Sequence, residues 1–210
     1  LTLKVAKKYN IQKNELEFFN CVESLIDSFF MNVVLKNQIE NCYIYAPAFK
    51  KYAQSARKFC KSVKQINRFD NMDYHIASDS VVIFTNPTKP DGKYYDLSEL
   101  FTFWKKRNAT IFIDEAFLDY CNESSFSSHI NEYDKLYVLK SMQRFYSIEG
   151  LKVATLVSNK KNIDQIKKQE AKYKLSVLDT NYLLDVLNDK NFKKINQAVN
   201  VKNMRLLEEV

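Results

Sequence analysis

The sequence predicts an α/β fold in which helices cover both faces of a mostly parallel sheet, a three-layer αβα arrangement. Two runs support this prediction, because residues 81–84 (VVIF) and 110–113 (TIFI) have the apolar character of strands buried on both faces. Between them, a helical pattern begins near Asp96, which is suited to an N-cap. This strand–loop–helix–strand order places the ligand crevice at the carboxyl ends of the strands, where Asn86 and Asp114 fall.

The rest of the chain continues this alternation of helices and strands. The predicted strands are residues 41–46, 136–139 and 152–157. The predicted helices are residues 23–34, 162–172 and 191–210, with further helical patterns at the start of the chain and from residue 175. A helix–strand passage covers residues 56–73, and the polar segment 120–133 is predicted to be loop and helix.

Composition narrows the class of protein. Among the 210 residues, 46% are hydrophobic, which is enough for a sizeable core, and the net charge is +7. The lysines are scattered without aromatic–basic interleaving, so solvated helix faces explain them better than a nucleic-acid surface. No apolar run approaches the roughly 18 residues of a membrane span, and nothing resembles a signal peptide. We therefore expect a cytoplasmic protein that binds neither nucleic acid nor membrane.

The cysteines and histidines give no sign of a metal site. The four cysteines, Cys21, Cys42, Cys60 and Cys121, have no CxxC spacing, and we interpret them as reduced, mostly buried thiols. His75 has no carboxylate or cysteine motif beside it. No metal ligand set is predicted.

Three ordered motifs resemble those of one enzyme family. Residues 86–92 (NPTKPDG) resemble the NPxxPxG turn of the fold-type I pyridoxal-phosphate enzymes, and residues 114–117 (DEAF) resemble their D-E-A-[FY] strand end. Residues 138–153 (VLKSMQRFYSIEGLKV) resemble their V-L-R-S-[LM]-[ST]-K-[FA]-[YF]-x-[IL]-x-G-L-R-[LV] segment. Within the class I/II aminotransferases, these motifs most resemble those of the histidinol-phosphate aminotransferases and the threonine-phosphate decarboxylases.

This resemblance implies a domain organisation and a set of partners. Residues 1–180 would form the large domain, and residues 181–210 a helical bridge. We expect the family's N-terminal arm and its C-terminal small domain, which carries the arginine that grips the substrate carboxylate, to be absent from this chain. The family also implies pyridoxal phosphate as cofactor, an amino acid or amino-acid phosphate ester as substrate, and a homodimer.

Four residues match positions that surround the cofactor ring in the family. Asp114 would pair with the protonated pyridine nitrogen, and Asn86 would donate to the phenolic oxygen. Phe49, within a segment that resembles P-T-[YF]-x-x-Y, would stack on the ring. Phe117 stands where many relatives carry a tyrosine that also touches the phenolic oxygen.

Structural alternatives exist for three of these residues. Asp114 could form a structural salt bridge, because buried carboxylates are rarely left unpaired. Asn86 could form an Asx-type turn before Pro87, a role compatible with cofactor binding. Phe49 could be a core residue beside Tyr52.

The phosphate-binding positions depart from the family pattern. Cys21 and Val22 lie in the segment that matches G-N-G-x-[ST], so both turn glycines and the hydroxyl at position 22 are missing, although a helix N-terminus could still hold an anion. Ser141 matches the first serine of S-x-[ST]-K and could bond phosphate, whereas Gln143 replaces the second hydroxyl. Lys152 replaces the phosphate-binding arginine, which keeps the charge but loses the bidentate fork.

Arg144 occupies the position of the lysine that forms the internal aldimine in the family. A guanidinium stays protonated and is a poor nucleophile, so arginine cannot replace that lysine. The sequence therefore predicts an aminotransferase-like protein with weak or no activity. The alternative is a catalytically silent pseudoenzyme that partners an active paralogue or binds an anionic metabolite.

Overall fold

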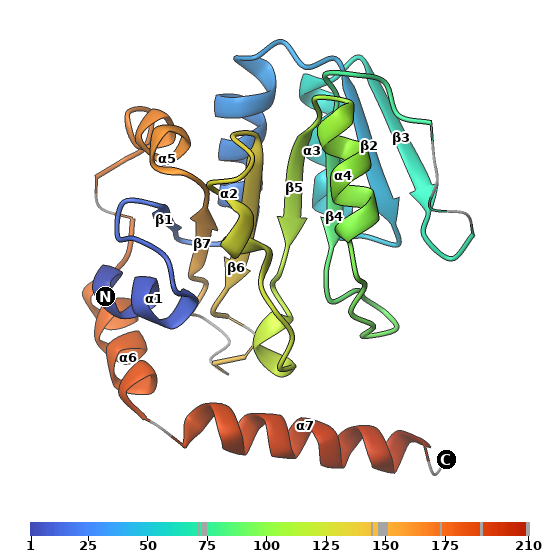
Figure 1. Ribbon diagram of the computed structural model, residues 1–210. Coiled ribbons are helices and arrows are strands. Elements are labelled where there is room, and N and C mark those ends of the chain that lie inside the picture. Colours follow the sequence, from blue (N-terminus) through green and yellow to red (C-terminus); the bar gives the residue numbers. More distant parts are fainter. Residues whose placement is uncertain are drawn as a thin grey trace.

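The computed structural model describes residues 1–70, 72, 75–143, 145–146, 151–172, 174–189 and 191–208, with side chains described as far as residue 202. A seven-stranded sheet organises these residues, in the order β1-β7-β6-β5-β4-β2-β3 (Figure 1). The strands are β1 (Leu16–Phe19), β2 (Asn41–Ala46), β3 (Ser62–Asn67), β4 (Val81–Thr85), β5 (Thr110–Asp114), β6 (Leu136–Ser141) and β7 (Ala154–Val157). Strands β2 to β6 pair in parallel, whereas β7 and β1 form an antiparallel edge beside β6. The predicted mostly parallel sheet is confirmed.

Helices pack on both faces of this sheet. The α-helices are α1 (Thr2–Tyr9), α2 (Val22–Phe29), α3 (Lys50–Phe59), α4 (Ser98–Lys106), α5 (Lys160–Lys167), α6 (Val177–Asn188) and α7 (Phe192–Glu208). A π-helical turn, η1 (Phe30–Leu35), continues α2, and the 3₁₀ turns η2 (Leu118–Tyr120) and η3 (Phe126–His129) follow β5. Residues of α1, α4 and α6 share one buried core, and residues of α2, η1, α3 and α5 share the other. The three-layer αβα arrangement is therefore confirmed.

The central strands divide their side chains between the two cores because successive side chains of a strand point to opposite faces. Val82 and Phe84 of β4 belong to the α4 core, while Val81 and Ile83 belong to the α2–α3 core. All five residues of β4 and all five of β5 are buried. This explains why both strands appear in the sequence as short runs without polar alternation.

Some boundaries differ from the prediction. Strand β1 was not predicted, and its four residues pair with β7, far along the chain. Helix α4 begins at Ser98, two residues after the predicted cap, and the Asp96 carboxylate accepts the Ser98 N–H at 2.9 Å. Helix α5 covers Lys160–Lys167, so it begins earlier and ends earlier than residues 162–172. Helix ends differ by such amounts because the terminal turns lack intrahelical partners.

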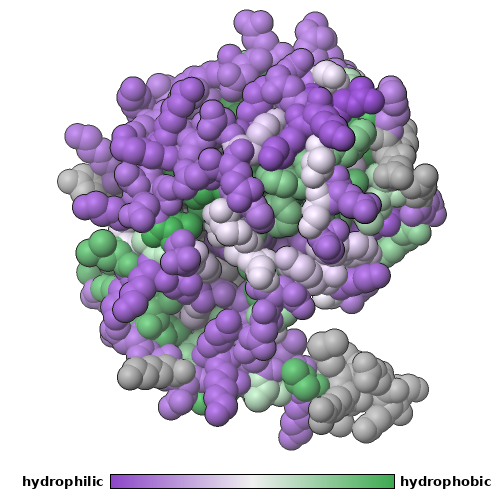
Figure 2. All heavy atoms as spheres, viewed as in Figure 1, coloured by the Kyte–Doolittle hydropathy of each residue, from purple (hydrophilic) through white to green (hydrophobic). Residues whose placement is uncertain are grey.

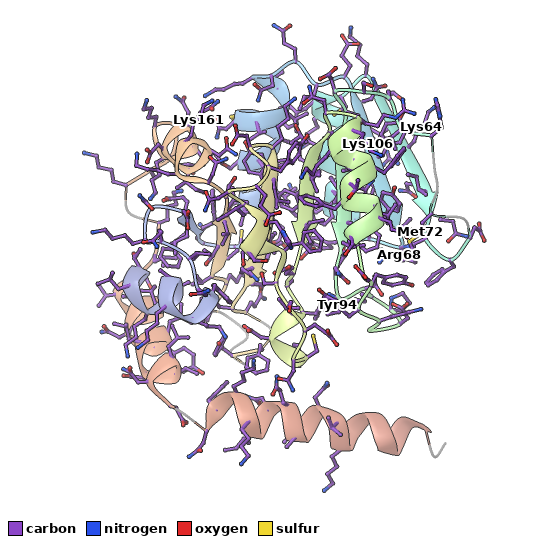
Figure 3. The ribbon with its side chains drawn as sticks, in the orientation of Figure 1. Lys64, Arg68, Met72, Tyr94, Lys106 and Lys161 are labelled. Atoms are coloured by element: carbon purple, nitrogen blue, oxygen red, sulfur yellow. The ribbon has the colours of Figure 1, made fainter. Side chains whose placement is uncertain are left out.

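The outer surface fits the charged composition. The face shown in Figure 2 is mostly hydrophilic, with smaller apolar areas between the polar side chains. Lys106 and Lys161 extend from the outer helices in Figure 3. Among the described residues, no helix is long and apolar enough to cross a bilayer.

Candidate active site

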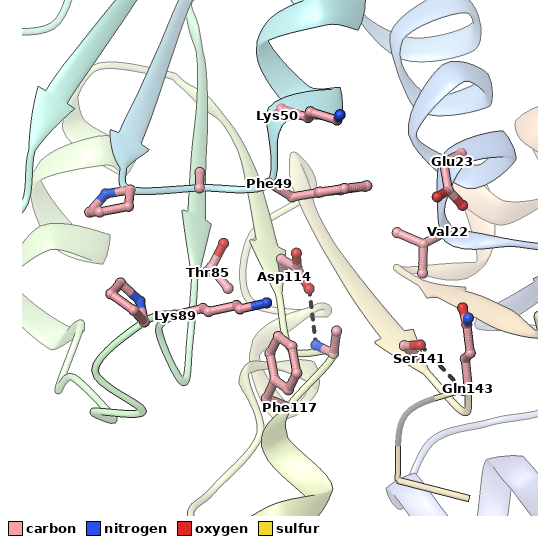
Figure 4. Close-up of a pocket in the computed structure, with 14 residues that line it drawn as sticks. Val22, Glu23, Phe49, Lys50, Thr85, Lys89, Asp114, Phe117, Ser141 and Gln143 are labelled. Atoms are coloured by element: carbon pink, nitrogen blue, oxygen red, sulfur yellow. Dashed lines mark hydrogen bonds between the residues drawn. The ribbon is translucent and has the colours of Figure 1, made fainter. Parts of the chain in front are cut away.

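A cavity of about 570 Å³ opens where the parallel strands end (Figure 4). Thr85 at the end of β4, Asp114 at the end of β5 and Ser141 at the end of β6 all line it. Pro47, which directly follows β2, completes this edge. The volume lies within the range of about 300–1,000 Å³ that is typical of small-molecule sites. The position matches the crevice predicted at the carboxyl ends of the strands.

Asp114 is the buried acidic group of this cavity, with 5% of its surface exposed. One carboxylate oxygen accepts the Tyr52 hydroxyl at 2.7 Å, and the other accepts the Ala116 N–H at 2.9 Å. Burial raises the pKa of Asp114, and this effect exceeds the opposing effect of the bonds from Tyr52 and Ala116. No ion pair to Asp114 occurs within the described part of the chain, so its two partners there are neutral donors.

Tyr52 is a site residue that the sequence reasoning did not assign. It lies on α3, is fully buried, and places its hydroxyl on Asp114. Burial, followed by the neighbouring Asp114 charge, holds the pKa of Tyr52 well above its ordinary value, so the phenol remains a hydrogen-bond donor. The tyrosine of the P-A-F-K-K-Y segment was the signal available in the sequence.

Two aromatic rings stand at the wall of the cavity. Phe49 is the N-cap residue of α3, and 41% of its surface is exposed. Its ring meets the Tyr52 ring edge-on, with centroids 6.3 Å apart. Phe117 lines the cavity from the turn that follows β5, and Figure 4 shows the two rings on either side of Asp114. Because Phe49 is exposed to the cavity, the interpretation of it as a core residue is wrong.

The end of β6 and the start of α2 form another side of the cavity. Ser141, Gln143 and Val22 line it, and the Ser141 hydroxyl accepts the Gln143 N–H at 3.4 Å. Cys21 is the N-cap of α2, where its sulfur accepts the Ser24 N–H, and it does not line the cavity. The N-terminus of α2 and the serine hydroxyl are suited to an anion, although Glu23 also faces this side.

A buried arginine holds the strand ends that carry these groups. Arg68 follows β3 (Figure 3). It donates to the backbone oxygens of Tyr45 at 2.8 Å, Thr85 at 3.4 Å and Pro47. These three oxygens belong to the ends of β2 and β4 or to the residue just beyond β2. Arg68 therefore fixes the spacing of two strands at the edge of the cavity.

Comparison with known proteins identifies the family of this chain. The family model of the class I and II aminotransferases matches residues 1–209. The chain belongs to this family. It is 25% identical, over 219 aligned positions, to a histidinol-phosphate aminotransferase of Francisella philomiragia subsp. philomiragia; the match covers 98% of this chain and 60% of that protein. The chain thus spans little more than half the length of this relative.

Solved structures of aminotransferase-family proteins share the fold. The histidinol-phosphate aminotransferase of Clostridium acetobutylicum superposes with a TM-score of 0.82 at 20% identity, over 99% of this chain and 64% of that one. The L-threonine-O-3-phosphate decarboxylase of Porphyromonas gingivalis gives 0.77 at 17% identity, over 89% and 60%. A histidinol-phosphate aminotransferase of Sinorhizobium meliloti in complex with pyridoxal-5′-phosphate gives 0.75 at 10% identity, over 94% and 56%.

Not every residue matched to the family's cofactor site reaches the cavity. Asn86 is buried behind it, and its side-chain amide exchanges two hydrogen bonds of 2.9 Å with the backbone of Tyr95, which holds the loop after β4. Lys152 is exposed and does not line the cavity. Arg144 lies outside the described residues. Of the predicted positions, the structure brings Val22, Phe49, Asp114, Phe117 and Ser141 to one cavity.

Lys140 faces the opposite side of the sheet from Ser141, as expected for neighbours on a strand. Its ammonium group pairs with Glu115 inside the protein and donates to Ser125 Oγ at 2.6 Å. Both charged side chains are almost fully buried. Lys140 is therefore a structural residue, although it precedes the family's S-x-[ST]-K loop.

The cavity of this aminotransferase-family chain suits pyridoxal phosphate by the chemistry of its groups. A carboxylate without a described cationic partner matches a protonated ring nitrogen, an exposed aromatic ring matches a pyridine face, and hydroxyl and N–H donors match a phosphate. Lys50 and Lys89 also line the cavity. No cluster of three or more metal-binding side chains occurs among the described residues.

Proposed function

We propose that this chain is an aminotransferase-like protein that binds pyridoxal phosphate in the Asp114 cavity and has weak or no transaminase activity. One observation carries the proposal: Asp114 is buried at the edge of an open cavity, and the described groups that bond it are neutral. A buried carboxylate without a cation is costly, and a bound pyridinium nitrogen would supply the missing positive charge.

A ring nitrogen paired with Asp114 would fix the orientation of the bound ring, and the neighbouring residues take their proposed roles from that orientation. Phe49 would stack on one face of the ring, and Phe117 would limit its other side. Ser141 and the first N–H groups of α2, beginning at Val22, would hold the phosphate. Asn86, Cys21 and Lys152 remain predictions from the family motifs. Bound pyridoxal phosphate supplies the electron sink for chemistry at an amino-acid carbon.

The reduced activity follows from Arg144. A lysine amine at this position can lose its proton and form a covalent bond with a carbonyl carbon, whereas a guanidinium cannot. The chain would keep the binding groups of the family without the group that links cofactor and protein at the usual place. An anion held by Arg144 is compatible with this proposal.

The substrate class, assembly and location are also proposals. Membership of the aminotransferase family supports an amino acid or amino-acid phosphate ester as substrate. A homodimer and a cytoplasmic location remain predictions from the sequence. We further propose residues 1–180 as the large domain and residues 181–210 as the bridge toward a small domain, although position 181 lies inside α6.

A second function is favoured by the two lysines of the cavity. Lys50 and Lys89 both line it, and ammonium groups attract phosphate and carboxylate ligands. A catalytically silent protein that binds an anionic metabolite, or supports an active paralogue, would use the same cavity without amino-group transfer.

A single-turnover assay tests the proposed function. Protein loaded with pyridoxal phosphate is mixed with glutamate, and the pyridoxamine phosphate formed is measured by chromatography. We expect slow or absent conversion in the native chain and at least a 100-fold faster conversion in Arg144→Lys, because a positioned acid–base group contributes about 10²–10⁴-fold. A Lys93→Arg variant is the matched control, because Lys93 is exposed and lies outside the cavity wall; it should behave as the native chain. Equal rates in native and Arg144→Lys proteins would contradict the proposal.

A further inference from the structure

We propose that Lys89 is the residue of this chain that reacts covalently with the aldehyde of pyridoxal phosphate. The inference rests on the proposed function and assigns an amine to the same cavity. It moves the reactive position from the segment after β6 to the turn after β4.

The placement of Lys89 is the first support. Lys89 lines the cavity together with Thr85, Asp114 and Phe117. Figure 4 shows its side chain extending from the turn toward Asp114. The part of the chain that the structure describes offers Lys89 no hydrogen-bond or ion-pair partner, and its side chain is exposed to the cavity. The aldehyde of pyridoxal phosphate lies at the end of the ring opposite the nitrogen, so the long Lys89 side chain would extend along the ring from the Asp114 end to reach it. No described contact of Lys89 has to break for this movement.

The turn that carries Lys89 is well fixed by its own backbone. The Thr88 N–H donates to the Lys93 oxygen at 2.9 Å, and the Gly92 N–H donates to the Thr88 oxygen at 3.0 Å. Gly92 has a φ of 66°, a conformation that glycine adopts without strain. Asn86 anchors the start of the turn to Tyr95. Because the backbone of this turn is fixed, the Lys89 amine can occupy only a limited volume, which favours reaction at one place.

Other lysines near the cavity are less suitable. Lys140 is buried in its pair with Glu115 on the opposite face of the sheet. Lys51 pairs with Asp27 at 2.5 Å, and Lys152 does not line the cavity. Lys50 lines the cavity, but Figure 4 shows it on the far side of Phe49 from Asp114. Among the described lysines that line the cavity, Lys89 is the one on the same side of the Phe49 ring as Asp114, which is the side where the pyridine ring would stack.

The reaction balances without an external oxidant or reductant. The deprotonated Lys89 amine adds to the aldehyde carbon, a carbon–nitrogen bond forms, and the carbonyl electron pair moves to oxygen. That oxygen leaves as water with the two hydrogens of the amine, so a carbon–nitrogen double bond remains. The amine must first lose the proton of its ammonium form, and water in the open cavity can accept it.

Borohydride trapping with peptide mapping tests the assignment. The native chain is incubated with pyridoxal phosphate, borohydride reduces the double bond to a stable secondary amine, and mass spectrometry locates the adduct. Lys93 lies on the same loop, is exposed and is absent from the cavity wall, so it reports background labelling. We expect at least tenfold more adduct at Lys89 than at Lys93. Lys89→Arg should lose the main adduct, and Lys93→Arg should keep it.

An analogue without an aldehyde separates this inference from the proposed function. 4′-Deoxypyridoxine 5′-phosphate can occupy the cavity but cannot form the double bond. It should bind in equilibrium dialysis and lower labelling at Lys89 at least tenfold, with no effect at Lys93. If the analogue binds but the adduct is found at Lys50, or equally at Lys89 and Lys93, the Lys89 inference is overturned and the proposed function stands. If the analogue does not bind, both the Lys89 inference and the proposed function are overturned. Mapping and protection use the native chain, so the test does not depend on the folding of a variant.

Discussion

The hydroxyl of Tyr52 donates a hydrogen bond of 2.7 Å to Asp114 Oδ2, between side chains 62 positions apart in the sequence. Both residues are buried, one on α3 and one at the end of β5. Because the donor is neutral, it orients the carboxylate without cancelling its charge. This contact joins the helix that carries Phe49 to the strand end that carries Asp114, and so sets the shape of the cavity.

Removing this hydroxyl should lower stability. In Tyr52→Phe, the buried Asp114 carboxylate keeps the Ala116 N–H as its described donor, so we expect the free energy of unfolding to fall by about 1–3 kcal/mol. Urea unfolding measures this change. Tyr94→Phe is the matched control, because the Tyr94 hydroxyl donates to the Ser124 oxygen at an exposed site; its effect should stay within about 0.5 kcal/mol. Equal effects of the two variants would contradict a special role for Tyr52.

The raised pKa of Asp114 predicts the sign of a pH effect. An aspartate in the unfolded chain titrates near about pH 3.9, whereas burial raises the folded pKa above that value. Between these two pKa values the folded state binds more protons, so stability falls as pH rises through the window. Asp114→Asn removes this dependence, and its stability relative to the native chain should therefore increase from pH 4 toward neutral pH, as measured by urea unfolding at stepped pH.

An exposed aspartate provides the opposite sign as a control. A hydrogen bond from Lys160 lowers the pKa of Asp164, so its contribution is present above the unfolded pKa and is lost as pH falls. The relative stability of Asp164→Asn should thus not increase as pH rises. A difference between native and Asp114→Asn proteins that is independent of pH would show that Asp114 has an ordinary pKa.

Phe49 should contribute affinity through its ring. In Phe49→Leu, we expect binding of 4′-deoxypyridoxine 5′-phosphate to weaken about 2–10-fold, because an aromatic pair is worth about 0.5–1.5 kcal/mol beyond area burial. Equilibrium dialysis measures the affinity. Phe69→Leu is the control, since Phe69 is exposed and outside the cavity wall. Unchanged affinity in Phe49→Leu would place the pyridine ring elsewhere.

Restoring a hydroxyl at the start of α2 should improve phosphate binding. Val22→Thr preserves the side-chain shape and adds a donor at the first residue of the helix. We expect affinity for the phosphate-bearing analogue to rise about fivefold, corresponding to about 1 kcal/mol for one hydrogen bond. Affinity for 4′-deoxypyridoxine, which lacks the phosphate, should stay the same. A gain for both ligands would mean that the hydroxyl acts on something other than phosphate.

The Lys140–Glu115 pair should matter for stability rather than for binding. Lys140→Met leaves Glu115 as a buried charge without its ammonium partner, and breaking such pairs costs about 3–5 kcal/mol. Thermal and urea unfolding would show the loss. Lys140→Met combined with Glu115→Gln should recover a substantial part of it. An unaffected single variant would show that the pair is not buried in solution.

Local patterns allowed the frame of the fold to be predicted. Strands β4 and β5 are short, apolar and bounded by loop residues, so the position of Asp114 at a strand end could be read directly from the sequence. Strand β1 could not, because its four residues lack clear polar–apolar alternation and its partner β7 lies far along the chain. The Tyr52–Asp114 contact could not be predicted either, because its two residues lie 62 positions apart in the sequence.

The candidate site was predictable only where a motif named it. Asp114, Phe49 and Ser141 stand at matched positions and reach the cavity. Lys89 occupies a variable position of the NPxxPxG turn, so no motif marked it, and its direction depends on the turn geometry. Lys140 could be assigned to the opposite face only once β6 was seen to continue through Ser141.

A crystal structure of this chain with 4′-deoxypyridoxine 5′-phosphate tests most directly whether the Asp114 cavity binds the cofactor. We predict the ring against Phe49, the ring nitrogen about 2.7–2.9 Å from an Asp114 oxygen, and the phosphate at the start of α2 beside Ser141. A ligand found outside the cavity, or a ring nitrogen directed away from Asp114, would contradict the claim that this cavity is a pyridoxal-phosphate site.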